Sequence, residues 1–202
     1  MLDPVLVSAV LVTRGDVNLR SIVDSLPYGE VVIWDNSKRH YDAKVYGRYL
    51  GIAEATNRVI FFQDDDCILS AAHHQLLLDA YEPGVVVGSM PYPDPMYQDT
   101  TLLGWGALFD RELPEIAFRN YNKVFPVDDA RFREEECEYV FPMLSRTKTV
   151  YADPSRMIDG EQVELRPNRM WRREEHYGRL FTGLYKARLA RDRLIERNQL
   201  WK

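Results

Sequence analysis

The segment that decides the fold is Arg58-Val-Ile-Phe-Phe-Gln-Asp64-Asp65-Asp66-Cys-Ile-Leu69, an apolar run that ends in three consecutive acids. Its apolar part predicts a buried strand. Three adjacent carboxylates repel one another and resist desolvation, so they do not stabilise a strand end by themselves. Hard divalent cations take oxygen ligands and often use only one or two protein carboxylates beside water and substrate phosphates. The segment therefore indicates a cation, and a metal-bridged nucleotide is the first hypothesis.

Strands and helices alternate on both sides of this segment. Apolar runs predict strands at 5–13, 30–35, 58–63 and 85–89, and near-helical spacing predicts helices at 17–26, 43–55 and 71–80. We expect His73 and His74 to occupy exposed positions on the last of these helices. Such alternation is typical of an α/β sheet with right-handed crossovers.

The second half of the chain is less regular. Three prolines at 91, 93 and 95 predict a loop over 90–101, and 102–109 could form a strand. Further along, the pattern predicts a helix over 128–144, a short strand at 147–151, a loop over 152–170 and a final helix over 174–198.

Length and composition favour one soluble, cytoplasmic domain. A chain of 202 residues has room for one well-buried core, and its two cysteines, Cys67 and Cys137, form no CxxC pair. The first residues do not resemble a secretory signal, and no apolar stretch approaches the roughly 18 residues of a membrane span. The sequence does not indicate an oligomeric state.

The charge is unevenly distributed along the chain. The net charge is −5, yet residues 166–202 carry eleven Lys or Arg against four acids. This asymmetry is typical of a protein that meets an anionic partner, such as a nucleic acid or a membrane surface. The alternative is a solvated helix face that offsets an acidic body.

The polar clusters follow the predicted strands. Thr13 and Arg14 follow the first strand, Asp35 and Asn36 the second, and the three acids the third. In open α/β sheets, ligands bind in the crevice beyond the carboxyl ends of the strands. We therefore expect these clusters to converge on one site.

The order of elements, with Asp-x-Asp closing the third strand and a glycine-containing segment after the fourth, resembles glycosyltransferases of the GT-A fold, especially family-2-like enzymes. The resemblance implies a mixed Rossmann-like sheet flanked by helices in a single domain over 1–202. Its parts would be a nucleotide-binding half (1–100), an acceptor half (101–170) and a basic C-terminal helix (171–202). The family's carboxylates hold Mg²⁺ or Mn²⁺, which bridges the diphosphate of a nucleotide-sugar donor. Asp64 and Asp66 match that role, although Asp66 could instead cap a helix.

The resemblance also implies donor-binding residues. Asp35 and Asn36 match the second-strand signature that recognises the nucleobase or ribose, although Asn-Ser is also ordinary turn chemistry. Arg48 matches a helix that sends a polar side chain to the nucleotide, and an Arg can pair bidentately with phosphate. The alternative for Arg48 is a surface position. The remaining expected donor-binding residues are Thr13, Arg14, Asp64 and Asp65.

Acceptor residues and a base follow from later motifs. Gly104, Trp105 and Gly106 are similar to the family's acceptor loop. The indole of Trp105 offers a flat apolar surface on which a sugar ring or a base can stack. An inverting transferase needs a carboxylate to take the acceptor proton. The run Arg133–Glu136 resembles an Arg-Glu-Ala-Asp signature of small phage-type glycosyltransferases, which makes Glu134 or Glu136 the base, with Asp129 next. Consecutive glutamates also suit a helix N-terminus.

The segment 168–176 resembles one that those enzymes carry before their last helix. GT-A enzymes often recruit a C-terminal His as a metal ligand, and His176 matches, unless it is a surface residue. A neutral imidazole suits Mn²⁺ better than Mg²⁺.

The sequence thus predicts a metal-dependent glycosyltransferase, with a hexosyl donor and a cytoplasmic location (host cytoplasm if phage-encoded). The basic tail, together with the resemblance to small phage-type enzymes, favours 5-hydroxymethylpyrimidine in DNA as acceptor. That base would be flipped out and stacked on Trp105 or Trp171. A glycan, lipid or protein acceptor stays open. The alternatives are a nucleotidyltransferase and a noncatalytic nucleic-acid-binding protein.

Overall fold

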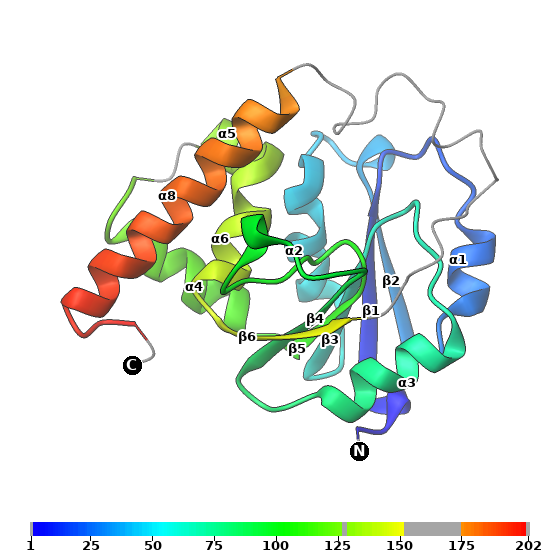
Figure 1. The fold of residues 1–202 in the computed structure, drawn as a ribbon. Coiled ribbons are helices and arrows are strands. Elements are labelled where there is room, and N and C mark those ends of the chain that lie inside the picture. Colours follow the sequence, from blue (N-terminus) through cyan, green and yellow to red (C-terminus); the bar gives the residue numbers. More distant parts are fainter. Residues whose placement is uncertain (1, 127–128, 152–174, 201–202) are drawn as a thin grey trace.

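The computed structural model describes residues 2–126, 129–151 and 175–200 (Figure 1). Its centre is one six-stranded sheet in the order β2-β1-β3-β5-β4-β6. The strands are β1 (Val7–Thr13), β2 (Glu30–Asp35), β3 (Val59–Gln63), β4 (Val85–Met90), β5 (Ala107–Asp110) and β6 (Arg146–Tyr151). Strand β1 pairs in parallel with β2 and β3, and β4 with β6, whereas β5 runs antiparallel to both β3 and β4. The sheet is therefore mixed, as predicted.

Helices cover both faces of the sheet (Figure 1). They are α1 (Arg20–Ser25), α2 (Gly47–Gly51), α3 (Ala71–Ala80), α4 (Leu113–Asn122), α5 (Asp129–Arg131), the π-helical turn η6 (Phe132–Glu136), α6 (Cys137–Met143) and α8 (His176–Glu196). Short 3-10 turns complete the described elements: η1 (Pro4–Leu6), η2 (Asn36–Lys38), η3 (Lys44–Tyr46), η4 (Ile52–Glu54) and η5 (Pro95–Tyr97).

The strands bury side chains on both faces because a strand alternates its side chains with a period of two. Ile60 and Phe62 of β3 pack in the cluster that α4, α6 and α8 complete. Val59 and Phe61 of the same strand pack on the opposite side, with Leu77 of α3. Burial on both faces explains why the strands of the sheet's centre are continuous apolar runs in the sequence.

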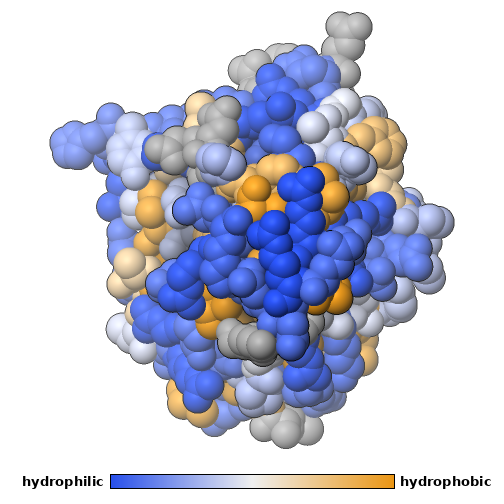
Figure 2. Space-filling model, turned by 90° about the vertical axis from the view of Figure 1, so that its left-hand side faces the viewer, coloured by the Kyte–Doolittle hydropathy of each residue, from blue (hydrophilic) through white to orange (hydrophobic). Residues whose placement is uncertain are grey.

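Helix α8 crosses the outside of the α4–α6 layer. Its buried stripe contains Leu180, Leu184, Ala187, Ala190 and Leu194. Figure 2 faces the side of the molecule where α8 lies and shows hydrophilic residues over most of it. In the part of the chain that the structure describes, none of the helices is long and apolar enough to cross a membrane.

The cations of α8 are largely engaged within the protein. Lys186 pairs with Glu136 at 2.7 Å, Arg179 with Glu134 at 3.0 Å, and Arg191 with Asp99 at 3.5 Å. Arg188 donates to the carbonyl of Met96 at 2.8 Å, and Arg193 lies over the ring of Phe125 at 5.4 Å. These contacts match the alternative in which the basic helix offsets an acidic body.

The structure corrects several local predictions. The strand expected over 102–109 begins only at Ala107, since Gly106 adopts a positive φ of 99° that a strand does not use. Helix α4 was not predicted. His73 and His74 are only 3% and 1% exposed because their side of α3 packs onto the sheet, so the prediction that they are exposed is wrong.

Candidate functional site

A cavity of about 560 Å³ opens beyond the carboxyl ends of β1 and β3. The register places these ends together, because Thr13 aligns with Asp35 of β2 while Leu11 aligns with Gln63 of β3. The opposite wall comes from η6, α6 and the first turns of α8. The site therefore combines residues from both ends of the chain.

Most of the predicted site residues with described side chains line this cavity. They are Thr13, Arg14, Asn36, Arg48, Asp64, Asp65, Asp66, Gly104, Trp105 and Glu134. The side chains of Asp129 and His176, and all of Trp171, lie outside the described residues.

Three predicted residues do not line the cavity. Asp35 turns its carboxylate to its own turn, where it accepts from the Ser37 hydroxyl at 2.6 Å and pairs with Lys38 at 2.8 Å. These contacts lower the pKa of Asp35, and the hydrogen bond from Lys38 contributes most. Gly106 packs under Leu69, and Glu136 is 3% exposed and paired with Lys186.

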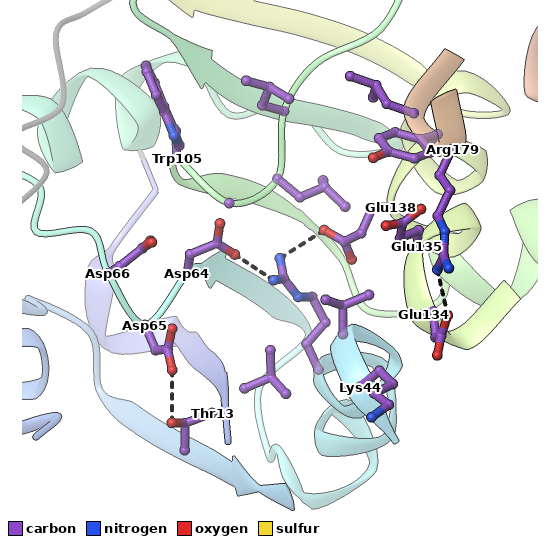
Figure 3. A pocket seen from close by; sticks show the side chains of 18 of the residues that line it. Thr13, Lys44, Asp64, Asp65, Asp66, Trp105, Glu134, Glu135, Glu138 and Arg179 are labelled. Atoms are coloured by element: carbon purple, nitrogen blue, oxygen red, sulfur yellow. Dashed lines mark hydrogen bonds and ion pairs between the residues drawn. The ribbon is translucent and has the colours of Figure 1, made fainter. Parts of the chain in front are cut away.

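The three acids after β3 point to different sides. Asp64 and Asp66 lie on the side of the loop that carries Trp105, whereas Asp65 turns toward Thr13 (Figure 3). The Thr13 hydroxyl donates to Oδ2 of Asp65 at 2.9 Å. The first and third acids therefore face the cavity, and the middle one ties β3 to β1.

Arg48 is the least exposed charged residue at the site. Its side chain is 2% exposed, and its Nη2 lies 2.6 Å from Oδ1 of Asp64, while Nη1 lies 3.2 Å from Oε2 of Glu138. Burial opposes its charge, but the carboxylates of Glu138 and Asp64 outweigh that effect and raise the pKa of the guanidinium above its usual value. The alternative of a surface position for Arg48 is excluded, because its side chain is buried.

Glu138 is a cavity residue that the sequence reasoning missed. Burial raises its pKa to about 7, although the nearby Arg48 acts to lower it. The Tyr49 hydroxyl also donates to its carboxylate at 3.3 Å. Helical spacing could have revealed it, since Glu134 and Glu138 are four residues apart and share a helix face, whereas Glu136 points to the other side.

Cations occupy the rim of the cavity. Arg14, Lys44 and Arg179 line it and are each about a third to a half exposed. Each of them has an acidic neighbour: Arg14 pairs with Asp16 at 2.8 Å, Lys44 with Asp42 at 2.6 Å and Arg179 with Glu134 at 3.0 Å. Partly exposed cations above a pair of carboxylates suit a ligand that carries both phosphate and a metal ion.

The donor set fits a hard divalent cation that completes its shell with water and phosphate. Asp64 and Asp66 both face the cavity, and two carboxylates suffice for such a cation. Among the described residues, no group of three His, Cys, Asp or Glu side chains is placed to hold a metal by itself. The fit thus depends on a ligand that brings its own oxygens.

No family model matches the chain, and no curated protein matches it. Solved structures do. S. aureus TarS 1-349 in complex with UDP-GlcNAc superposes with a TM-score of 0.53 at 10% identity, over 97% of this chain and 73% of that chain. The 4-diphosphocytidyl-2C-methyl-D-erythritolsynthase from Anaerococcus prevotii DSM 20548 superposes with a TM-score of 0.52 at 13% identity, over 80% and 95%. The fold is GT-A-like, which confirms the fold that the resemblance implied.

Proposed function

We propose that the protein is a metal-dependent glycosyltransferase that moves a sugar from a nucleoside-diphosphate sugar to an acceptor hydroxyl. The observation that carries this proposal is the meeting of Asp64, Asp66 and the rim cations in one cavity at the carboxyl ends of the strands. A similar fold holds UDP-GlcNAc in the TarS structure, which supports a nucleotide-sugar donor.

Several of the predicted residues that line the cavity have a direct role in this proposal. Asp64 and Asp66 would hold Mn²⁺ or Mg²⁺, with His176 as a further ligand. The bound cation would neutralise charge that develops on the departing diphosphate. The Asn36 amide accepts from Trp34 and Ala43 and donates to the Lys44 carbonyl, so it would contact the nucleoside through its second amide hydrogen. Arg14 with Lys44 would attract the phosphates.

The acceptor must lose a proton as its oxygen attacks the anomeric carbon. Glu134 lines the cavity and is 39% exposed, so its carboxylate can reach an entering hydroxyl. Asp129 is the alternative. Glu136 is a poor candidate, because its carboxylate is buried against Lys186 and Arg131.

Fewer features of the cavity bear on the identity of the acceptor than on that of the donor. Trp105 lines the cavity and could stack on a sugar or on a flipped base, including 5-hydroxymethylpyrimidine in DNA. The ion pairs of α8 weaken the electrostatic case for DNA, because engaged cations release fewer counterions from phosphate. A salt titration tests this acceptor: no DNA binding even near 50 mM salt, a value at the low end of such titrations, would exclude it.

The donor is tested with a thermal-shift panel of UDP-, GDP- and ADP-sugars, each with and without Mn²⁺. We expect one nucleotide series to raise Tm, with a larger shift when Mn²⁺ is present. The Asp64→Asn/Asp66→Asn variant should lose the Mn²⁺-dependent part of the shift. Asp24→Asn, at an exposed position of α1, is the control. The proposal fails if no nucleotide sugar stabilises the protein.

A nucleotidyltransferase is the second candidate, favoured by the likeness to the 4-diphosphocytidyl-2C-methyl-D-erythritolsynthase fold. It would take a nucleoside triphosphate and release pyrophosphate, whereas a glycosyltransferase releases a nucleoside diphosphate. Product analysis after incubation with each donor class separates the two.

A further inference from the structure

Arg48 is the least exposed Lys or Arg among the residues that the structure describes, and it lies beside the acids that follow β3. Arg48 comes from α2, Asp64 from the end of β3 and Glu138 from α6, so three separate elements meet at one guanidinium. Figure 3 draws the two contacts as dashed lines that end on Asp64 and Glu138. The Arg48 guanidinium is thus held between a carboxylate at the end of the sheet and a carboxylate of the helical layer.

Exposure within this group shows which residue a ligand can reach. The side chains of Arg48, Glu138 and Asp64 are 2%, 16% and 39% exposed. A guanidinium with so little surface has almost none to offer a diphosphate. All three residues line the cavity, and Asp64 is the most exposed of them, with its Oδ1 already held by Arg48.

We propose that Arg48 is a positioning residue, which orients the Asp64 carboxylate for the metal and does not contact the donor. The Glu138 carboxylate lies 3.2 Å from the other side of the guanidinium, and Tyr49 in turn donates to Glu138 at 3.3 Å. The inference rests on the proposed function, because it assumes that Asp64 binds the cation. It replaces the expectation that Arg48 pairs with phosphate.

Outer partners of metal-binding carboxylates contribute through orientation, and their loss typically costs 10–100-fold in metal affinity. Removing Arg48 alone would leave the buried Glu138 carboxylate unpaired and could unfold the protein. The main variant is therefore Arg48→Met/Glu138→Gln, which removes both charges. Glu138→Gln alone keeps the Arg48–Asp64 contact and loosens only the support behind it.

Two affinities are measured for each folded variant: that for Mn²⁺ without nucleotide, by isothermal calorimetry, and that for UDP in EDTA. We expect the double variant to weaken Mn²⁺ binding about 10–100-fold and to leave UDP binding in EDTA unchanged. Glu138→Gln should shift the Mn²⁺ affinity in the same direction by less. Arg58→Met is the matched control, since Arg58 pairs with the buried Asp110 at the opposite end of β3.

The opposite results would overturn the inference. Weaker UDP binding in EDTA with unchanged Mn²⁺ affinity would make Arg48 a direct ligand of the nucleotide. Tighter Mn²⁺ binding would mean that Arg48 competes for Asp64. If the unmodified protein binds neither Mn²⁺ nor any nucleotide, the proposed function fails instead, so the two failures are distinguishable.

Discussion

The backbone N–H of Asp64 donates to the carbonyl of Gly104 at 2.8 Å, so the end of β3 is tied to the loop that precedes β5. The Asp64 carboxylate also packs directly against Gly104, because a Cβ added at Gly104 would clash with Oδ2 of Asp64. The loop can pass this close only because residue 104 has no side chain. The position of the first acid is thereby set from one side by Arg48 and from the other by Gly104.

Replacing Gly104 with Ala should therefore displace the Asp64 carboxylate. We expect Mn²⁺ affinity to fall by roughly tenfold or more, as for the loss of an outer partner of a metal ligand, while the far-ultraviolet circular dichroism stays unchanged. Gly178→Ala in α8 is the control, since an added Cβ there meets nothing within 4 Å. An Ala at 178 should raise stability by up to about 1 kcal/mol and leave Mn²⁺ binding intact. Unchanged metal affinity in Gly104→Ala would refute the tight contact.

Substituting the two glutamates on opposite sides of the η6 turn should affect different properties: kcat for Glu134 and stability for Glu136. Glu134→Gln is expected to lower kcat about 100-fold or more with little loss of stability, because its pair with Arg179 is partly exposed. Glu136→Gln should instead lower the free energy of unfolding, by about 1–2 kcal/mol, because Lys186 and Arg131 lose the charge of their buried partner while staying partly exposed to water. Urea unfolding and initial rates, measured on both variants, check the pair. Equal kcat values for the two variants would contradict the assignment.

Acid should destabilise the protein through His74. Burial, with a smaller contribution from the neighbouring His73, lowers the pKa of His74 to about 4 from an ordinary value near 6.5. Because the unfolded chain then binds the proton more tightly, stability is full above pH 6.5 and falls as the pH drops from 6.5 to 4. The shift corresponds to about 3 kcal/mol.

The variant His74→Gln removes this titration and can still hydrogen-bond to Tyr28, whose hydroxyl lies 3.0 Å from Nδ1 of His74. Its free energy of unfolding, measured by urea at several pH values, should fall less steeply between pH 6.5 and 4 than that of the unmodified protein. His40→Gln, at an exposed histidine, should keep the original slope. A slope unchanged in His74→Gln would assign the acid sensitivity elsewhere.

The local pattern predicted the elements that depend on burial alone. Strand β3 and the acids behind it follow from an apolar run and a charge cluster, which need no distant partner to be recognised. The antiparallel strand β5 was harder to predict, because short strands and turn glycines carry weak signals. Helix α4 was not predicted. The exposure of His73 was misjudged, since periodicity does not say which neighbour covers a helix face.

By itself, the sequence determined the α/β class, the acids at the end of the third strand and the convergence of polar residues at the strand ends. These properties follow from hydrophobic periodicity and from the geometry of parallel strands. Only the tertiary structure decided the burial of Arg48 and its pairing with Asp64, the cavity position of Glu138 and the internal pairing of the α8 cations. Charges pair according to distance and burial in space, and residues 48, 64 and 138 are brought together only when α2, β3 and α6 pack.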